Sequence, residues 1–290
     1  MLARRDLTLL VGISGIWGFN LIAAKVGVTE IPPILFTALR FGLLTLVTLP
    51  FLKVFPGQMR TLLLAAALSG ALQFSLLFAG LAVAHDVSTV AIASQLGIPM
   101  TTLLSVWLLK ETIRWRRILG IVLAFGGVAV IAFDPGVLVY SHGLGLIIAS
   151  CLAGSLGLTY IKRLDGIGPL ELQAWLAMTA WPLLLGLSFM LEDGQWASLQ
   201  AASFTAWGAL LFTSLINSLF AHTAMFYLIQ RYPVTSVAPL TLLSPLFSIL
   251  FGVTLLDDQL SPRMVLGGAI TLLGILIVAL RDRRMVDTGS

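Results

Sequence analysis

One basic side chain stands deep inside a long apolar stretch of this sequence. Arg40 lies about 10 Å from the nearer end of its stretch, at 1.5 Å per helical residue. A guanidinium at that depth either reaches back to the surface along its own alkyl stem or pairs with a carboxylate through two parallel hydrogen bonds. Arg40 is therefore a candidate receptor for the carboxylate of a bound solute.

Four uncharged or weakly basic polar residues also lie near the middle of apolar stretches, namely Gln73, Gln95, Asn217 and His222. Such residues are costly in lipid unless they face the interior of a helical bundle. Each one alone is explained by hydrogen bonding between helices. Their common depth favours a shared polar site.

Small hydroxyl residues form two stripes with helical spacing. The stripes consist of Ser94, Gly97, Thr101 and Ser105 and, 147 residues further on, of Thr241, Ser244, Ser248 and Gly252. This spacing lets helices pack closely and bond to one another, or it lines a polar cavity. Prolines 99, 239 and 245 remove backbone hydrogen bonds close by, and freed carbonyls are tolerated only against protein or water. This favours a cavity.

Two tryptophans, Trp17 and Trp181, fall near the middle of their stretches. Either is explained by buried packing, or it forms a wall against the apolar part of a solute. Asn20 follows Trp17 by three residues and shares its helical face. The complete set of candidate substrate-binding residues is Trp17, Asn20, Arg40, Gln73, Ser94, Gln95, Trp181, Asn217, His222, Thr241 and Ser244.

The sequence lacks the groups that catalysis or ATP hydrolysis would need. Its carboxylates fall at predicted helix ends and in loops, where Asp257 and Asp258 are expected to be solvated, and it contains no HExxH, Walker or glycine-rich nucleotide motif. Without a carboxylate in mid-membrane, strict coupling to protons or sodium is disfavoured. We expect no enzyme activity, no metal and no cofactor, and a membrane-embedded transferase is the weakest alternative.

The composition requires a membrane. Of the 290 residues 58% are hydrophobic and 10% charged, against roughly 25% charged in soluble domains. Apolar stretches long enough to cross a bilayer recur almost end to end, which predicts an all-α integral membrane protein with ten transmembrane helices. The predicted spans are 7–26, 34–52, 61–82, 87–108, 115–133, 143–161, 170–190, 205–229, 235–256 and 263–280.

The chain repeats itself. Residues 86–131 align with residues 233–278 without a gap, and 12 of the 46 positions are identical. Gly120 matches Gly267 and Gly127 matches Gly274, so the identities extend beyond common apolar residues. We infer two five-helix repeats, residues 1–138 and 139–290, and internal repeats are typical of transporters.

The basic residues predict the orientation of the chain. With the N-terminus inside, the inner loops and tails hold fourteen Lys and Arg residues and the outer loops two. This bias explains the net charge of +4 without nucleic acid. Both termini are predicted to be cytoplasmic, and because each repeat has five helices the second repeat is inverted.

The sequence resembles the EamA family of the drug/metabolite transporter superfamily. The resemblance covers nearly the whole chain and rests on the WGFN run at 17–20, the ALRF run at 38–41 and the VAPLTLLSPLFSILFGVTLLDDQL run at 237–260. Within the family, the chain is most similar to bacterial exporters of amino-acid metabolites of the cysteine and O-acetylserine type. It departs from them at Asp257-Asp258-Gln259 and at Gly154, where relatives often carry Trp.

The resemblance implies a secondary transporter in the cytoplasmic membrane that exports small metabolites, most of all amino acids or their derivatives, by alternating access. A carrier for nucleobases or nucleosides, sugars or drug-like cations is the alternative. The expected partners are a small-molecule substrate and membrane lipid, without nucleic acid, and either a monomer or a homodimer fits.

Overall fold

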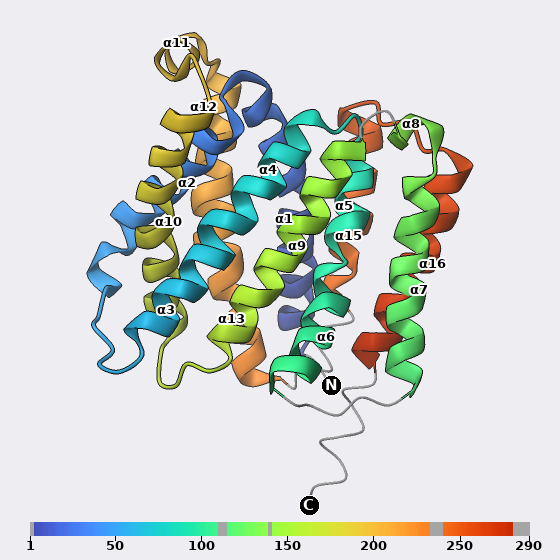
Figure 1. The fold of residues 1–290 in the computed structure, drawn as a ribbon, viewed down its shortest axis with the longest axis horizontal. Helices are drawn as coiled ribbons and strands as arrows, with labels where there is room; N and C mark the ends of the chain where they lie inside the picture. Colours follow the sequence, from blue (N-terminus) through green and yellow to red (C-terminus); the bar gives the residue numbers. More distant parts are fainter. Residues whose placement is uncertain (1–2, 110–114, 139–140, 233–239, 281–290) are drawn as a thin grey trace, which may run out of the picture.

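The computed structural model describes residues 3–109, 115–138, 141–232 and 240–280, and within these ranges the chain forms helices and connections but no strand. The helices run side by side as one bundle (Figure 1). The upper end of the bundle in Figure 1 holds α8, α11 and the connection between α4 and α5, and α1 starts at the lower end.

The first half of the chain contains these helices: α1 (Arg4–Glu30), α2 (Pro33–Thr48), η1 (Leu49–Phe51), α3 (Met59–Ala66), η2 (Ala67–Leu72), α4 (Gln73–Val83), α5 (Val87–Ser94), α6 (Gly97–Leu109), α7 (Trp115–Ala132) and α8 (Pro135–Leu138). The second half contains α9 (Ser141–Ile161), α10 (Pro169–Leu191), α11 (Gln195–Ala201), α12 (Phe204–Leu211), η3 (Phe212–Ala221), α13 (His222–Arg231), α15 (Leu243–Leu255) and α16 (Pro262–Leu280).

Helices occupy all ten predicted spans, although residues 235–239 lie outside the described residues. Among the described residues, seven helical stretches are long and apolar enough to cross a membrane, and three apolar helices are shorter. The seven are Arg4–Glu30, Pro33–Phe51, Met59–Val83, Val87–Leu108, Ser141–Ile161, Pro169–Leu191 and Phe204–Met225; the shorter ones are Ile118–Ala132, Leu243–Leu255 and Pro262–Val278. The protein is all-helical with several membrane-spanning helices, and the count of ten crossings stays a prediction.

Proline fixes both the starts and the interruptions of these helices. Pro33, Pro169 and Pro262 each stand first in a helix, where the missing N–H has no partner to lose. Pro99 and Pro245 instead follow interruptions, at residues 95–96 and at residue 242. A proline removes the hydrogen bond to the carbonyl four residues earlier and crowds that carbonyl. The two interruptions are therefore local consequences of proline, and they lie 147 residues apart.

Two segments are wound as π-helix, in which hydrogen bonds reach back five residues. The first is η2, between α3 and α4, and the second is η3, between α12 and α13. Moving η2 by 147 positions gives residues 214–219, which fall inside η3. The distortions thus recur with the offset that relates the repeated sequences. π-helical turns are rare and are frequent at functional sites.

Glycines let α7 and α16 approach one another closely. A Cβ atom added to Gly120 would lie 2.7 Å from the carbonyl oxygen of Gly274, and one added to Gly274 would lie 2.6 Å from that of Gly120. Gly127 and Gly267 face each other in the same reciprocal way. The glycines that match in the repeated sequences therefore meet crosswise, as helices related by a two-fold axis would.

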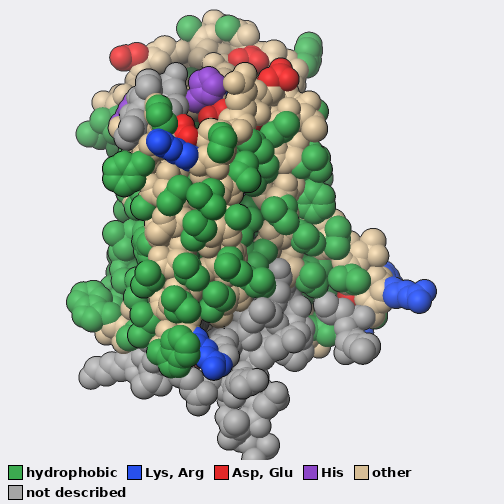
Figure 2. Space-filling model, turned by 90° about the vertical axis from the view of Figure 1, so that its right-hand side faces the viewer, with side chains coloured by type: hydrophobic (Ala, Val, Ile, Leu, Met, Phe, Trp, Pro, Cys, Tyr) green, Lys and Arg blue, Asp and Glu red, His purple; other side chains and the backbone are tan. Residues whose placement is uncertain are grey.

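The surface follows the predicted membrane pattern. Figure 2 shows hydrophobic side chains over the middle of one face, with carboxylate and histidine side chains at the upper end and most visible Lys and Arg side chains at the lower end. Exposed apolar residues of α7 and α16 include Val122 at 60% and Val265 at 56%. Such a band suits the hydrocarbon layer of a bilayer.

Candidate functional site

Arg40 lies two turns into α2, and its side chain turns into the bundle. It is 1% exposed. Its Nε and Nη2 atoms donate to the hydroxyl oxygen of Ser218 in η3, at 3.1 and 2.8 Å. Within the described residues no carboxylate forms an ion pair with Arg40. The interpretation that Arg40 reaches back to the membrane surface is therefore wrong, because its charged group is buried and bonded to Ser218.

Three phenylalanine rings surround the guanidinium. Its central carbon lies 4.5 Å from the ring centre of Phe74 and 5.4 Å from those of Phe41 and Phe78. Aromatic faces attract cations, and more strongly where water is excluded. The rings accept no ordinary hydrogen bond, however. They stabilise the charge of Arg40 but leave its Nη1 group without a hydrogen-bond partner.

Ser218 lies in the π-helical segment η3 and its hydroxyl faces Arg40. The Ser218 hydroxyl donates to the carbonyl oxygen of Thr213, five residues earlier, at 2.8 Å, so its lone pairs remain for Arg40. The amide nitrogen of Gln173 in α10 donates to the Ser218 carbonyl at 3.0 Å. In return, the hydroxyl of Ser214 donates to the Arg40 carbonyl at 2.9 Å. Ser218 thus holds the guanidinium, and hydrogen bonds to the backbone carbonyls of Ser218 and Arg40 hold the two residues in place.

Trp17, Asn217 and His222 form a connected group beside this contact. The ring centres of Trp17 and His222 are 5.5 Å apart. The Nδ1 atom of His222 lies 2.8 Å from the carbonyl oxygen of Asn217, and because a carbonyl only accepts, Nδ1 carries the proton. Asn217 directly precedes Ser218 in η3. The structure therefore brings Trp17, Arg40, Asn217 and His222 together around one π-helical segment.

Several candidate residues carry buried polar atoms without a hydrogen-bond partner. These atoms are Trp17 Nε1, Asn20 Oδ1, Arg40 Nη1, Ser94 Oγ, Trp181 Nε1 and Asn217 Oδ1. Leaving a buried donor or acceptor unsatisfied costs about 1–3 kcal/mol for each group. Both donors and acceptors remain available, as a polar ligand would require.

Gln73, Ser94 and Gln95 lie elsewhere, along α9. Gln73 packs onto the bare backbone of Gly154, where its side chain fills the space that a Cβ atom would need. Gln95 lies in the interruption between α5 and α6. The amide of Ile98 bonds there to the Gln95 carbonyl, which frees the carbonyl of Ser94 to accept from the Cys151 thiol at 3.4 Å. These contacts join helices.

Thr241 and Ser244 lie where α15 meets α1. The hydroxyl of Ser14 donates to the carbonyl of Leu240, next to Thr241, at 3.3 Å. A Cβ atom on Gly18 would lie 3.0 Å from the Ser244 carbonyl oxygen. The stripe hydroxyls themselves serve helix packing in two places, since Thr101 donates to Ser155 of α9 at 3.0 Å and Ser248 to the Gly18 carbonyl at 3.1 Å.

Trp181 lies on the wall of an apolar groove of about 680 Å³ between α2, α10 and α12. The groove is lined almost entirely by apolar side chains, including Leu46 and Leu211, which are 73% and 50% exposed. Trp181 also packs against the cluster that contains Phe41 and Phe74. It therefore connects the groove with the aromatic surroundings of Arg40.

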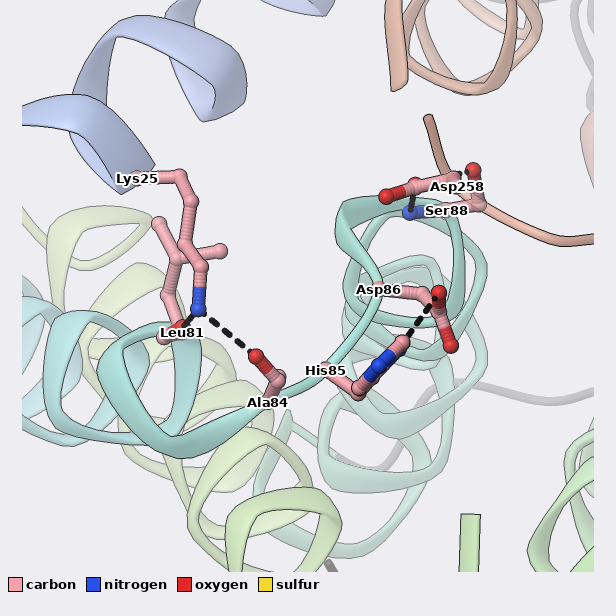
Figure 3. A network of polar contacts seen from close by, with 7 residues as sticks. All are labelled: Lys25, Leu81, Ala84, His85, Asp86, Ser88 and Asp258. Carbon is pink, nitrogen blue, oxygen red and sulfur yellow. Dashed lines mark hydrogen bonds and ion pairs between the residues drawn. The ribbon is translucent and has the colours of Figure 1, made fainter. Parts of the chain in front are cut away.

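Charged residues that the sequence assigned to loops bind helix ends at the upper end of the bundle. The Nζ atom of Lys25 donates to the carbonyls of Leu81, Ala82 and Ala84 at 2.6–3.2 Å, at the end of α4. Figure 3 shows the contacts with Leu81 and Ala84. Asp258 accepts from the backbone and the hydroxyl of Ser88 at the start of α5 (Figure 3). Because Asp258 is 7% exposed, the expectation that it is solvated is wrong.

Carboxylates hold two further helix starts at this end. Glu192 accepts from the amides of Ile34 and Leu35 in α2 at 2.7 and 2.9 Å. Glu30 accepts from the amide and hydroxyl of Ser203, just before α12, at 2.6 and 2.8 Å. Negative charge is favourable at a helix N-terminus. These contacts could not be predicted from the sequence, because Glu192 and Glu30 each lie more than a hundred residues from their partners.

A model of the EamA-like transporter family matches residues 6–133 and again residues 141–280. The chain belongs to the EamA-like transporter family. It is similar to a probable amino-acid metabolite efflux pump of Escherichia coli, at 26% identity over all of both chains. It is also similar to a protein of the same description from Salmonella typhimurium, at 27% identity over 95% of each chain. Members of this family are transporters, and this chain is a multi-pass membrane transporter rather than an enzyme.

The fold is that of a solved crystal structure with 18% sequence identity. The two chains superpose with a TM-score of 0.64, over 98% of this chain and 99% of that chain. At this identity the likeness concerns the fold. The EamA-like fold thus provides the frame that holds the side chains around Arg40.

Proposed function

We propose that this protein is a secondary transporter that exports small metabolites, above all amino acids or their derivatives, across the cytoplasmic membrane of a bacterium. The similarity to probable amino-acid metabolite efflux pumps supports this substrate class. The observation that carries the proposal is the set of buried donors and acceptors without partners around Arg40, Asn217 and Trp17. An amino acid offers both a carboxylate to such donors and an ammonium group to such acceptors.

Alternating access would arise from ten helices arranged as two inverted repeats, residues 1–138 and 139–290. The family model matches the chain twice, and the π-helical segments and the proline interruptions recur 147 residues apart. These distortions are places where a helix bends without losing many hydrogen bonds. The two halves would rock against each other about the site near Arg40.

The proposed orientation places both termini in the cytoplasm. The excess of Lys and Arg in alternate loops and tails supports it. The described part of α1 starts at the lower end in Figure 1, so this end would be cytoplasmic and the end with Lys25 and Asp258 would be external. Substrate would then leave past α4–α5 and α15–α16.

The test is efflux from proteoliposomes that contain the purified protein and a mixed pool of radiolabelled amino acids, with and without an imposed pH gradient. We expect selective loss of some amino acids at rates that do not depend on the pH gradient, because the carboxylates of the described residues lie at helix ends or in connections. Protein-free liposomes give the leak rate. If no amino acid leaves faster than this leak, the proposed substrate class is wrong, and nucleosides, sugars and organic cations form the next panel.

A further inference from the structure

We propose that Arg40 is the receptor for the free carboxylate of the transported solute, so that the protein selects small monocarboxylates, with or without an ammonium group. This inference rests on the proposed transport function and names what the site recognises. It starts from a guanidinium that is 1% exposed and has no ion pair among the described residues. An ionised side chain inside a membrane bundle is expensive, and it marks a functional site when its partner is missing.

The geometry indicates which edge of the guanidinium binds the solute. Nε and Nη2 are both directed at the single oxygen of Ser218, so the side edge is occupied. Nη1 is buried and has no partner. A guanidinium has five N–H groups in a planar fork, which leaves the end formed by Nη1 and Nη2 for two parallel bonds to a carboxylate.

The surroundings favour a carboxylate over more highly charged anions. Arg40 supplies one positive charge, and its immediate neighbours are the rings of Phe41, Phe74 and Phe78. One charge in an apolar setting balances one negative charge and leaves a dianion uncompensated. A phosphate monoester or a dicarboxylate is therefore disfavoured, whereas a zwitterionic amino acid or a simple monocarboxylate fits.

Ser218 acts as a positioning residue. Its own proton goes to Thr213 in the π-helical segment, so the oxygen presents only lone pairs to Arg40. Without the Ser218 hydroxyl, Nε and Nη2 lose their acceptor and the guanidinium can rotate. The edge formed by Nη1 and Nη2 is then no longer held in position for the carboxylate. A loss of carboxylate binding in Ser218→Ala, without loss of binding by the α-amides, which lack the carboxylate, distinguishes this role from a merely structural one.

The experiment measures ligand-induced thermal stabilisation of the full-length protein in detergent, from which a dissociation constant follows. The probes are alanine, leucine and phenylalanine, each compared with its α-amide, which lacks the carboxylate, and its N-acetyl derivative, which keeps it. For the native protein we expect the amides to bind on the order of 100-fold more weakly than the acids, since a site built to hydrogen-bond one group rejects analogues without it. The N-acetyl derivatives should keep binding that depends on Arg40.

The variants are Arg40→Gln, Ser218→Ala and, as a matched control, Arg60→Gln, which removes an exposed arginine. Arg40→Gln should reduce the affinity for the acids to that for the amides, and Arg60→Gln should leave the ratio of acid to amide unchanged. If Arg40→Gln does not fold, the comparison of acids with amides on the native protein and the Ser218→Ala variant still decide.

The outcomes separate this inference from the proposed function. Equal binding of acids and amides by the native protein overturns carboxylate recognition and leaves amino-acid export standing. Binding of N-acetyl derivatives that requires Arg40, without binding of any amino acid, supports carboxylate recognition and contradicts amino-acid export. Sodium chloride titrated alone must not stabilise the native protein as strongly as the acids do; if it does, and Arg40→Gln abolishes the effect, Arg40 is an inorganic anion site and the inference is wrong.

Discussion

The Oδ2 atom of Asp258 accepts hydrogen bonds from both the backbone amide and the hydroxyl of Ser88, at 2.8 and 2.6 Å. Asp258 lies between α15 and α16, whereas Ser88 is the second residue of α5. Asp86 precedes α5, but its side chain makes no hydrogen bond to the start of that helix. Its Oδ1 atom instead lies 3.0 Å from the Nδ1 atom of His85. A residue 170 positions away thus satisfies the start of α5, and it ties the two halves of the chain together.

We expect Asp258→Asn to lower the free energy of unfolding by about 1–2 kcal/mol, because two hydrogen bonds to a charged acceptor become neutral ones. The matched control is Asp257→Asn, the same change at the exposed neighbouring residue. Thermal unfolding of both variants in detergent measures the difference. Equal midpoints for the two variants would mean that the Ser88 contact contributes nothing to stability.

Gly126 and Gly127 in α7 should respond in opposite directions to the same substitution. A Cβ atom on Gly126 meets nothing within 4 Å, whereas one on Gly127 collides with Thr271 and Gly267 of α16. Alanine is favoured over glycine in a helix by roughly 0.5–1 kcal/mol, so Gly126→Ala should raise the unfolding midpoint. Gly127→Ala should lower it, because α7 and α16 must separate.

The comparison of Gly126→Ala with Gly127→Ala contains its own control, since the residues are adjacent and the substitution is identical. Unfolding midpoints in the same detergent give the sign of each effect. Stabilisation by both substitutions would show that α7 and α16 do not pack as closely as the structure places them.

The sequence predicted the helices and the residues at mid-depth, because both depend on local properties. A run of apolar residues must form helix in lipid wherever it lies, and the depth of Arg40 or His222 follows from counting along that helix. The family resemblance was also predictable and is confirmed by the match over residues 6–133 and 141–280.

The direction in which a side chain turns was not predictable, because it depends on distant segments. Ser218 faces Arg40 from the π-helical segment η3, and the local sequence FTSLINSLFA does not predict that winding. Gln73 packs above Gly154, which lies on another helix, and counting along the sequence does not predict that contact. Asp258 looked solvated because its partner, Ser88, is far away in the sequence.

Transport of neutral amino acids should not respond to membrane voltage. Arg40 carries its charge in both the loaded and the empty carrier, so the charge moved in one cycle equals the net charge of the solute, which is zero for a zwitterion. One elementary charge across 100 mV corresponds to about 2.3 kcal/mol, roughly a fifty-fold change in the accumulation ratio. Potassium gradients with valinomycin, applied to the efflux assay, measure this directly. A fifty-fold response with a neutral amino acid would reveal a coupled ion.

Deleting one residue from η3 should abolish carboxylate recognition without preventing the protein from folding. A π-helical segment holds one residue more than the α-helix it interrupts, so deletion of Ile216, which is 42% exposed, should restore ordinary winding. Residues on either side would then rotate by about 100° relative to each other, and Ser218 would turn away from Arg40.

We expect the deletion variant to insert and to purify as a monodisperse protein, yet to bind alanine, leucine and phenylalanine no better than their amides. Ile216→Ala, which keeps the chain length, should retain the preference for the acids. Thermal stabilisation by each ligand provides the readout. Unchanged preference in the deletion variant would show that Ser218 does not aim Arg40, because the contact of 2.8 Å between them cannot survive a rotation of this size.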